Sequence, residues 1–198
     1  MNLKDTLINL SYNFTWFSKI YYEFTMMSFS AVEKSCDIPK FKKIEDIKNL
    51  ISDGGYEHDN IGNIIKDYLI HPRVIQCRLN NKSALGDCDD HAIYWCTAIK
   101  KSDLAKKIWF SFFSMKEEGK NPKYSAYAVC VFLGKDDKFY WCDYFLPRII
   151  QKPEDFQIDS ANLYKKEAIC GAMWEVIGLK SDDTPIFGEI KKVLPRKK

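Results

Sequence analysis

The chain has 198 residues and a formal net charge of +3, and 46% of its residues are hydrophobic. This composition supplies enough apolar side chains for a sizeable core and excludes a disordered chain. The small positive charge makes nucleic acid a poor candidate for the partner. The sequence holds no run of about 18 apolar residues and opens without a signal peptide, so we expect no membrane span and a cytoplasmic location.

Seven cysteines are present, an odd number, and no two of them form a C-x-x-C pair. One chain cannot pair all seven, so a complete disulfide framework is excluded and a reducing compartment is expected. We interpret five of them as unpaired or core thiols: Cys36, Cys77, Cys96, Cys130 and Cys170.

Residues 3–29 carry apolar side chains at steps that alternate between four and three. This spacing predicts a long helix that packs along another helix. Its seam consists of Leu3, Leu7, Leu10, Phe14, Phe17, Tyr21 and Phe24. We expect it to pack on its own chain; a surface for a protein partner and a helix lying at a membrane interface are the alternatives. The predicted division is an N-terminal helical extension, residues 1–34, and a domain of residues 35–198.

Two shorter helices are predicted near residues 43–52 and 60–70, with a glycine-containing turn between them. His58 lies in that turn. His71 precedes a proline, where we expect the second helix to end. Both histidines are interpreted as solvated loop residues.

A further helix is predicted over residues 88–99, within a stretch that reads GDCDDHAIYWC. Asp87 can cap this helix, while Asp89 and Asp90 fall in the first turn, where the helix dipole favours negative charge. Cys88 therefore stands at the N-terminal tip of a helix with a buried apolar face.

Three strands are predicted next, at residues 107–115, 125–133 and 138–145. The first is apolar on both faces, as a central strand is. The other two flank the turn signal GKDD and form a hairpin. Helices followed by an antiparallel sheet indicate an α+β fold.

If the hairpin folds about Lys135, Tyr127 lies directly opposite Asp143, with Cβ atoms roughly 5 Å apart. Asp143 then lies among aromatic side chains on its strand, where a carboxylate needs a partner or a function. Beyond the hairpin, residues 159–179 are expected to hold a helix and then a short strand or turn. The last eight residues carry five basic side chains and are expected to be solvated.

A cysteine at a helix tip, a base on a neighbouring strand and an acid behind the base form the thiol version of the nucleophile–base–acid arrangement. The stretch GDCDDHA resembles the cysteine box of bacterial and phage transglutaminase-like cysteine proteases, and YAVCVFLGKDDKFYWCDY is similar to their histidine and aspartate strands. The resemblance covers residues 80–146. It implies a papain-like fold, with a central cysteine-bearing helix packed on an antiparallel sheet, Cys88 as nucleophile and Asp143 as the orienting acid.

One position departs from that pattern, because Tyr127 stands where the family has histidine. Near pH 7 tyrosine is a proton donor, whereas neutral imidazole is an acceptor. Loss of the base typically lowers the rate by about 10³- to 10⁶-fold. His91, one turn from Cys88, is the candidate for a substitute base, but we expect it to be a packing or surface residue. No cofactor is predicted, and a metal site on these two residues lacks a second spaced pair of ligands.

Three functions remain open. The first is a catalytically degenerate member of the family that binds a peptide or protein in a cleft at Cys88 or forms part of an assembly, cytoplasmic or, if phage-encoded, virion-associated. The second is an active thiol peptidase or acyl transferase with a rearranged base. The third is a structural protein that interacts through its N-terminal helix.

Overall fold

The computed structural model describes residues 6–7, 26, 34–56, 69–119, 122–144 and 147–193. Its elements in chain order are α3 (Ile44–Ser52), β1 (Gly55–Tyr56), α4 (Pro72–Asn80), β2 (Ala84–Gly86), α5 (Cys88–Lys101), β3 (Ala105–Lys116), β4 (Tyr124–Gly134), β5 (Phe139–Cys142), β6 (Arg148–Ile150), the 3-10 turn η2 (Pro153–Asp155), α6 (Phe156–Leu163), β7 (Glu167–Leu179) and β8 (Pro185–Val193). The predicted α+β class is confirmed.

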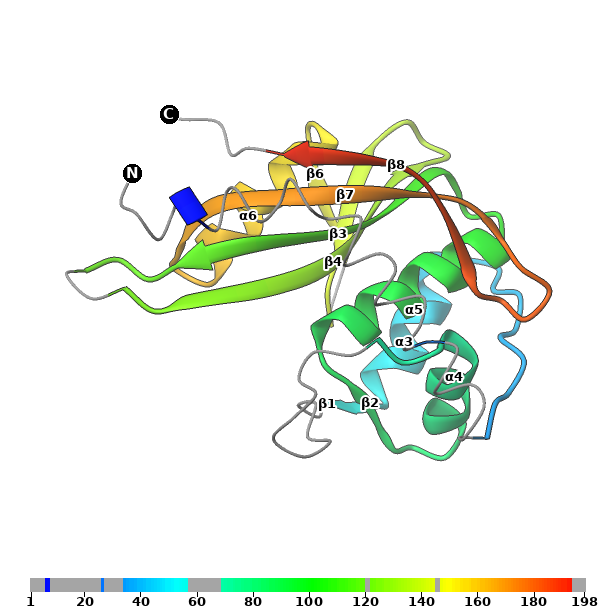
Figure 1. Cartoon of the computed structure of the whole chain (residues 1–198). Helices are drawn as coiled ribbons and strands as arrows, with labels where there is room; N and C mark the ends of the chain where they lie inside the picture. The colour runs from blue at the N-terminus through cyan, green and yellow to red at the C-terminus, as the bar shows by residue number, and fades with distance from the viewer. Residues whose placement is uncertain are drawn as a thin grey trace.

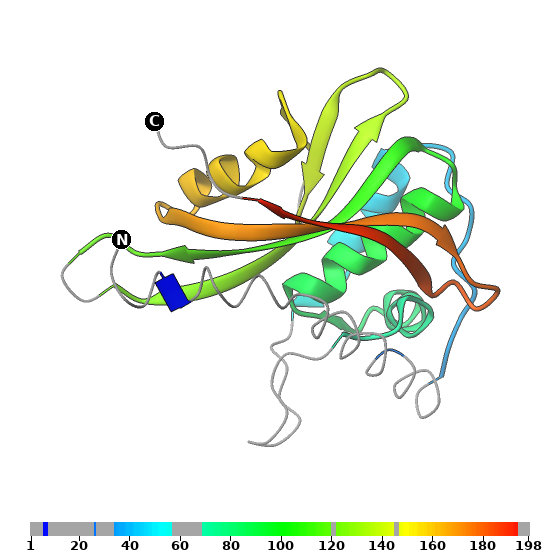
Figure 2. The ribbon, with the colours of Figure 1, turned by 45° about the horizontal axis from the view of Figure 1, so that its top comes forward.

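Six strands form one antiparallel sheet in the order β6-β5-β4-β3-β7-β8, and β1 and β2 form a separate parallel pair. β3 lies between β4 and β7, which confirms the predicted central strand. In Figures 1 and 2, α5 runs along one face of the sheet and α6 covers the other. Successive side chains of β3 point to opposite faces, so Phe110 joins the core beside α5 and Phe113 packs against Phe156 of α6.

The β4–β5 hairpin folds one residue later than predicted. Cys130 pairs with Cys142, which centres the turn on Asp136 instead of Lys135. Asp137 closes this turn with a positive φ of 64°, a conformation that aspartate tolerates better than most residues.

Tyr127 is therefore not directly opposite Asp143, and that part of the prediction is wrong. β5 ends at Cys142, so Asp143 follows the strand. The shift moves the pairing by an even number of residues and leaves both side chains on the same face as diagonal neighbours.

Pro72 begins a helix where the sequence predicts the end of one. Proline suits the first helical position, since its missing N–H has no partner there in any case. His71 caps this helix: its Nδ1 accepts a hydrogen bond from the Arg73 amide, and its Nε2 lies 3.0 Å from the Thr184 hydroxyl. His71 is only 2% exposed, so its assignment to a solvated loop is wrong.

The C-terminal third contains more strand than predicted. β7 is 13 residues long, because its middle is buried on both faces, between the core at α5 and the core at α6. β8 pairs along it and continues to Val193. The first residues of the basic tail thus belong to an edge strand, and residues 194–198 lie outside the described part of the chain.

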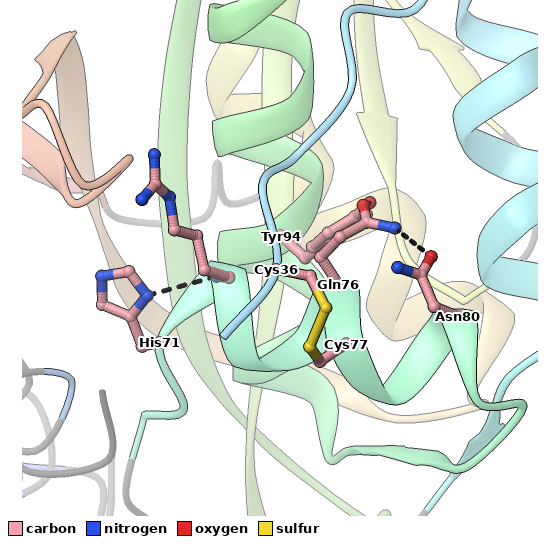
Figure 3. The surroundings of a disulfide bond; sticks show 7 residues. Cys36, His71, Gln76, Cys77, Asn80 and Tyr94 are labelled. Atoms are coloured by element: carbon pink, nitrogen blue, oxygen red, sulfur yellow. Dashed lines mark hydrogen bonds between the residues drawn. A yellow bond between two sulfur atoms is a disulfide. The ribbon is translucent and has the colours of Figure 1, made fainter. Parts of the chain in front are cut away.

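Cys36 and Cys77 form a disulfide between the extended residues before α3 and the middle of α4, with Cα atoms 5.0 Å apart (Figure 3). Their assignment as unpaired thiols is wrong. The other five cysteines form no disulfide, as expected.

Most of the predicted N-terminal helix, together with His58 and residues 60–68, lies outside the described residues. Leu7, a seam residue, is 57% exposed, whereas Met26, which is not in the seam, is fully buried in the core that contains α5. The described helices include none that is long and apolar enough to cross a membrane.

Candidate active site

The N-terminus of α5 is held by a reciprocal pair of caps. The Asp87 carboxylate accepts hydrogen bonds from backbone amides of the first turn, and the Asp90 carboxylate accepts one from the Asp87 amide. The second Asp90 oxygen accepts a hydrogen bond of 2.6 Å from the Ile70 amide. Asp90 thus joins the chain before α4 to the tip of α5 and fixes the turn that carries Cys88.

Gly86 allows this arrangement. Its φ is +131°, and a Cβ at this position would lie 1.8 Å from the Asp90 carboxylate. Only glycine combines this backbone conformation with so close an approach.

Asp89 is buried beside these caps, and one of its oxygens has no partner among the described residues. Burial, reinforced by the hydrogen bond to Asp87 and by the neighbouring charges, raises the pKa of Asp89 well above its ordinary value. One carboxylate oxygen from each of Asp87, Asp89 and Asp90 lies within 4.8 Å of the other two, as the ligands of an ion would. Since Asp87 and Asp90 are engaged in capping, the grouping has a sufficient explanation in the helix start.

Of the five cysteines outside the disulfide, Cys88 is half-buried and the other four are fully buried. Burial raises the pKa of the Cys96 and Cys142 thiols, which keeps them protonated and inert. Cys88 is therefore the most accessible of the five thiols to a reagent or ligand.

Two tyrosine hydroxyls lie within hydrogen-bonding distance of one oxygen of the Asp143 carboxylate. Because the shorter contact between the hydroxyls takes one of their two protons, one proton is left to donate to Asp143. The Tyr127 hydroxyl lies 3.4 Å and the Tyr164 hydroxyl 3.2 Å from the same carboxylate oxygen, and the two hydroxyls are 2.6 Å apart. Trp95 of α5 donates to the Asp143 carbonyl, which ties this cluster to the helix of Cys88. The predicted proximity of Tyr127 and Asp143 is confirmed although the predicted register is wrong.

Both tyrosines are firmly protonated. Burial, together with the Asp143 charge, raises the pKa of Tyr127 far above its ordinary value. The pKa of Tyr164 rises to about 12, chiefly through burial, and negative charge on Asp143 and on Cys88 contributes. Cys88 is thus electrostatically coupled to Tyr164, while Tyr127 and Tyr164 can donate protons to hydrogen bonds but cannot act as bases near neutral pH.

His91 is buried on α5, 3% exposed, and neither ring nitrogen has a hydrogen-bond partner among the described residues. Burial lowers its pKa to about 4. Its ring meets that of Tyr144 edge to face at 4.5 Å, and Tyr144 in turn contacts Tyr127. His91 therefore packs on Tyr144, which lies between it and the tyrosine cluster formed by Tyr127, Tyr164 and Asp143.

Tyr164 is the site residue that the sequence did not indicate. It follows the last residue of α6, in a stretch without a motif, and reaches Asp143 only because α6 folds across the sheet. Comparisons of the chain with protein families, with curated proteins and with solved structures found no match.

Proposed function

We propose that this protein is a catalytically degenerate relative of the transglutaminase-like cysteine proteases, which binds a peptide or protein ligand at the Cys88 end of α5 without cleaving it. The observation that carries the proposal is the engagement of Asp143 by two tyrosine hydroxyls. In the thiol mechanism, this carboxylate orients an imidazole.

The tyrosine cluster favours binding over catalysis. A cysteine protease needs a group that removes the thiol proton and returns it to the leaving amine. Tyr127 and Tyr164 are donors at neutral pH, and the Asp143 carboxylate is already engaged by this pair of hydroxyls. The half-buried Cys88 and the two tyrosines offer a thiol and hydroxyls that can hold the carbonyl and amide groups of an extended chain.

The alternative is an active thiol hydrolase with His91 as the base. Its support is that both nitrogens of His91 lack partners among the described residues. Against it, a pKa of about 4 makes the imidazole a poor proton acceptor for a thiol, and the ring packs against Tyr144.

Restoring the imidazole tests the proposal. In Tyr127→His combined with Tyr164→Phe, Asp143 is released to orient the new ring, and Cys88 should react with iodoacetamide at pH 7 at least about tenfold faster than in the parent, since its thiolate becomes an ion pair. Tyr127→Phe with Tyr164→Phe is the matched control and should show no gain. Equal rates in both variants would refute the inference that Tyr127 occupies the position of the base.

A further inference from the structure

The residues before α3 are attached to α4 by one covalent bond and a few polar contacts. Residues 34–41 have no regular secondary structure, and within them Ile38 is buried in the core. The Cys36–Cys77 disulfide joins this segment to α4 (Figure 3). The Cys36 amide also donates a hydrogen bond to the Arg73 carbonyl at 2.9 Å. We call residues 34–41 the strap.

Arg73 of α4 also links the strap to the turn between β7 and β8. Its guanidinium contacts Asp37 of the strap at 3.0 Å and Asp183 of the β7–β8 turn at 2.8 Å. Lys101, at the end of α5, also contacts Asp183 at 2.7 Å. Asp37 is largely exposed, so its ion pair adds little, and the disulfide is the strong link between the strap and α4.

α4 in turn holds the helix of Cys88. The Ile70 amide, just before α4, donates to the carboxylate of Asp90, and the Tyr94 hydroxyl of α5 donates to Gln76 of α4 at 2.5 Å. A shift of α4 therefore acts on the first turn of α5, where Cys88 lies.

We propose that the Cys36–Cys77 disulfide is a redox-controlled clamp, which fixes the strap and α4 when oxidised and loosens both, together with the Cys88 turn, when reduced. The proposal does not depend on whether Cys88 catalyses a reaction. The proposal revises the expectation that the protein stays in a reducing compartment, because a disulfide persists where the environment is oxidising.

The two sulfurs differ in access, which sets the course of reduction. Cys36 is half-buried, whereas Cys77 is 4% exposed. One thiolate of a dithiol attacks the sulfur of Cys36, the S–S bond breaks, and Cys77 leaves as a thiolate that takes up a proton. The second thiol of the reagent then closes its own disulfide and releases Cys36 as a thiol, so two electrons pass from the dithiol to the protein.

Trypsin digestion of the full chain with and without dithiothreitol tests the release of the strap. Lys40, Lys42 and Lys43 are exposed in or beside the strap, while Lys106 and Lys107 are exposed on β3 and report global opening. Reduction should accelerate cleavage at the strap sites and leave the β3 sites unchanged. Fragments of the oxidised protein should stay joined without reductant, because the cut falls between Cys36 and Cys77.

The reactivity of Cys88 is the second readout. Pulsed iodoacetamide labelling, read by peptide mass spectrometry, should modify Cys88 several-fold faster after reduction or in Cys36→Ser with Cys77→Ser. Cys170→Ser removes a buried thiol outside the clamp and should match the parent. A loop of 41 residues also predicts that reduction increases the unfolding equilibrium constant on the order of 10²- to 10³-fold.

Three results would overturn the clamp. The first is that Cys36 and Cys77 can still be alkylated after treatment with oxidised glutathione. The second is that reduction accelerates trypsin cleavage equally at the strap sites and at the β3 sites. The third is that the labelling rate of Cys88 does not change on reduction. If the double serine variant does not fold, reduction of the parent protein decides. The proposed function fails on a different result, an absolute Cys88 rate in the oxidised protein far above that of a free thiol.

Discussion

His91→Phe should remove much of the acid sensitivity of this fold. Burial lowers the pKa of the imidazole from 6.5 to about 4. The unfolded chain therefore binds more protons than the folded chain between these two values. The stability that the neutral imidazole provides is complete above pH 6.5 and is lost as the pH falls toward 4. The loss from this group is about 2 kcal/mol between pH 7 and pH 5, at about 1.4 kcal/mol per pH unit.

Urea unfolding at pH 7 and pH 5, followed by the fluorescence of the buried tryptophans, measures this difference. Phenylalanine keeps a ring against Tyr144 and does not titrate, so the variant should lose about 2 kcal/mol less than the parent over this interval. Tyr144→Phe preserves the ring contact and the titrating histidine, and should retain the pH dependence of the parent.

Equal losses in the parent and in His91→Phe would refute the assignment of His91 as a buried neutral imidazole. They would also remove the argument against His91 as the base, because an imidazole with an ordinary pKa can accept the proton of Cys88. The measurement thus bears on both stability and mechanism.

Two further predictions concern the start of α5. Gly86→Ala should destabilise the fold by about 2 kcal/mol more than Gly119→Ala in urea unfolding, because both have a φ near +130° but only the Cβ at Gly86 collides with the Asp90 carboxylate. Equal losses of stability in the two variants would mean that the Asp90 carboxylate moves away from the new Cβ and still caps α5. Asp89→Asn should stabilise the protein at pH 7 by about 1 kcal/mol, since a buried carboxyl with a raised pKa weakens the fold as pH rises, and the gain should vanish near pH 4 in the same assay. A gain independent of pH would contradict the raised pKa.

The sequence was most informative where local chemistry and periodicity agree. α5 begins where Asp87 caps it, and β3 is central because both of its faces are apolar. The Tyr127–Asp143 contact was also predicted, although the register was wrong. The turn is centred on Asp136 and closed by a positive φ at Asp137, and the turn signal GKDD does not by itself say which of its residues is the centre.

The rest depended on distant segments. A proline such as Pro72 is compatible with the start of one helix or the end of another. The contact of the buried His71 with Thr184 of the β7–β8 turn accompanies the start of α4 here, and the local sequence does not reveal that contact. The pairing of Cys36 with Cys77 requires the strap to lie on α4, a contact across 41 residues without a local signature. Tyr164 joined the site for the same reason, because α6 crosses the sheet before reaching Asp143.

The reaction rate of Cys88 with iodoacetamide across pH tests the central claim most directly. A thiol without a base is only a few per cent thiolate at pH 7, so the oxidised protein should be labelled no faster than glutathione, with a rate that keeps rising between pH 6 and pH 8. A rate more than about tenfold above glutathione at pH 7, and flat from pH 6 to 8, would mean that an activated thiolate is present and that the site is catalytic.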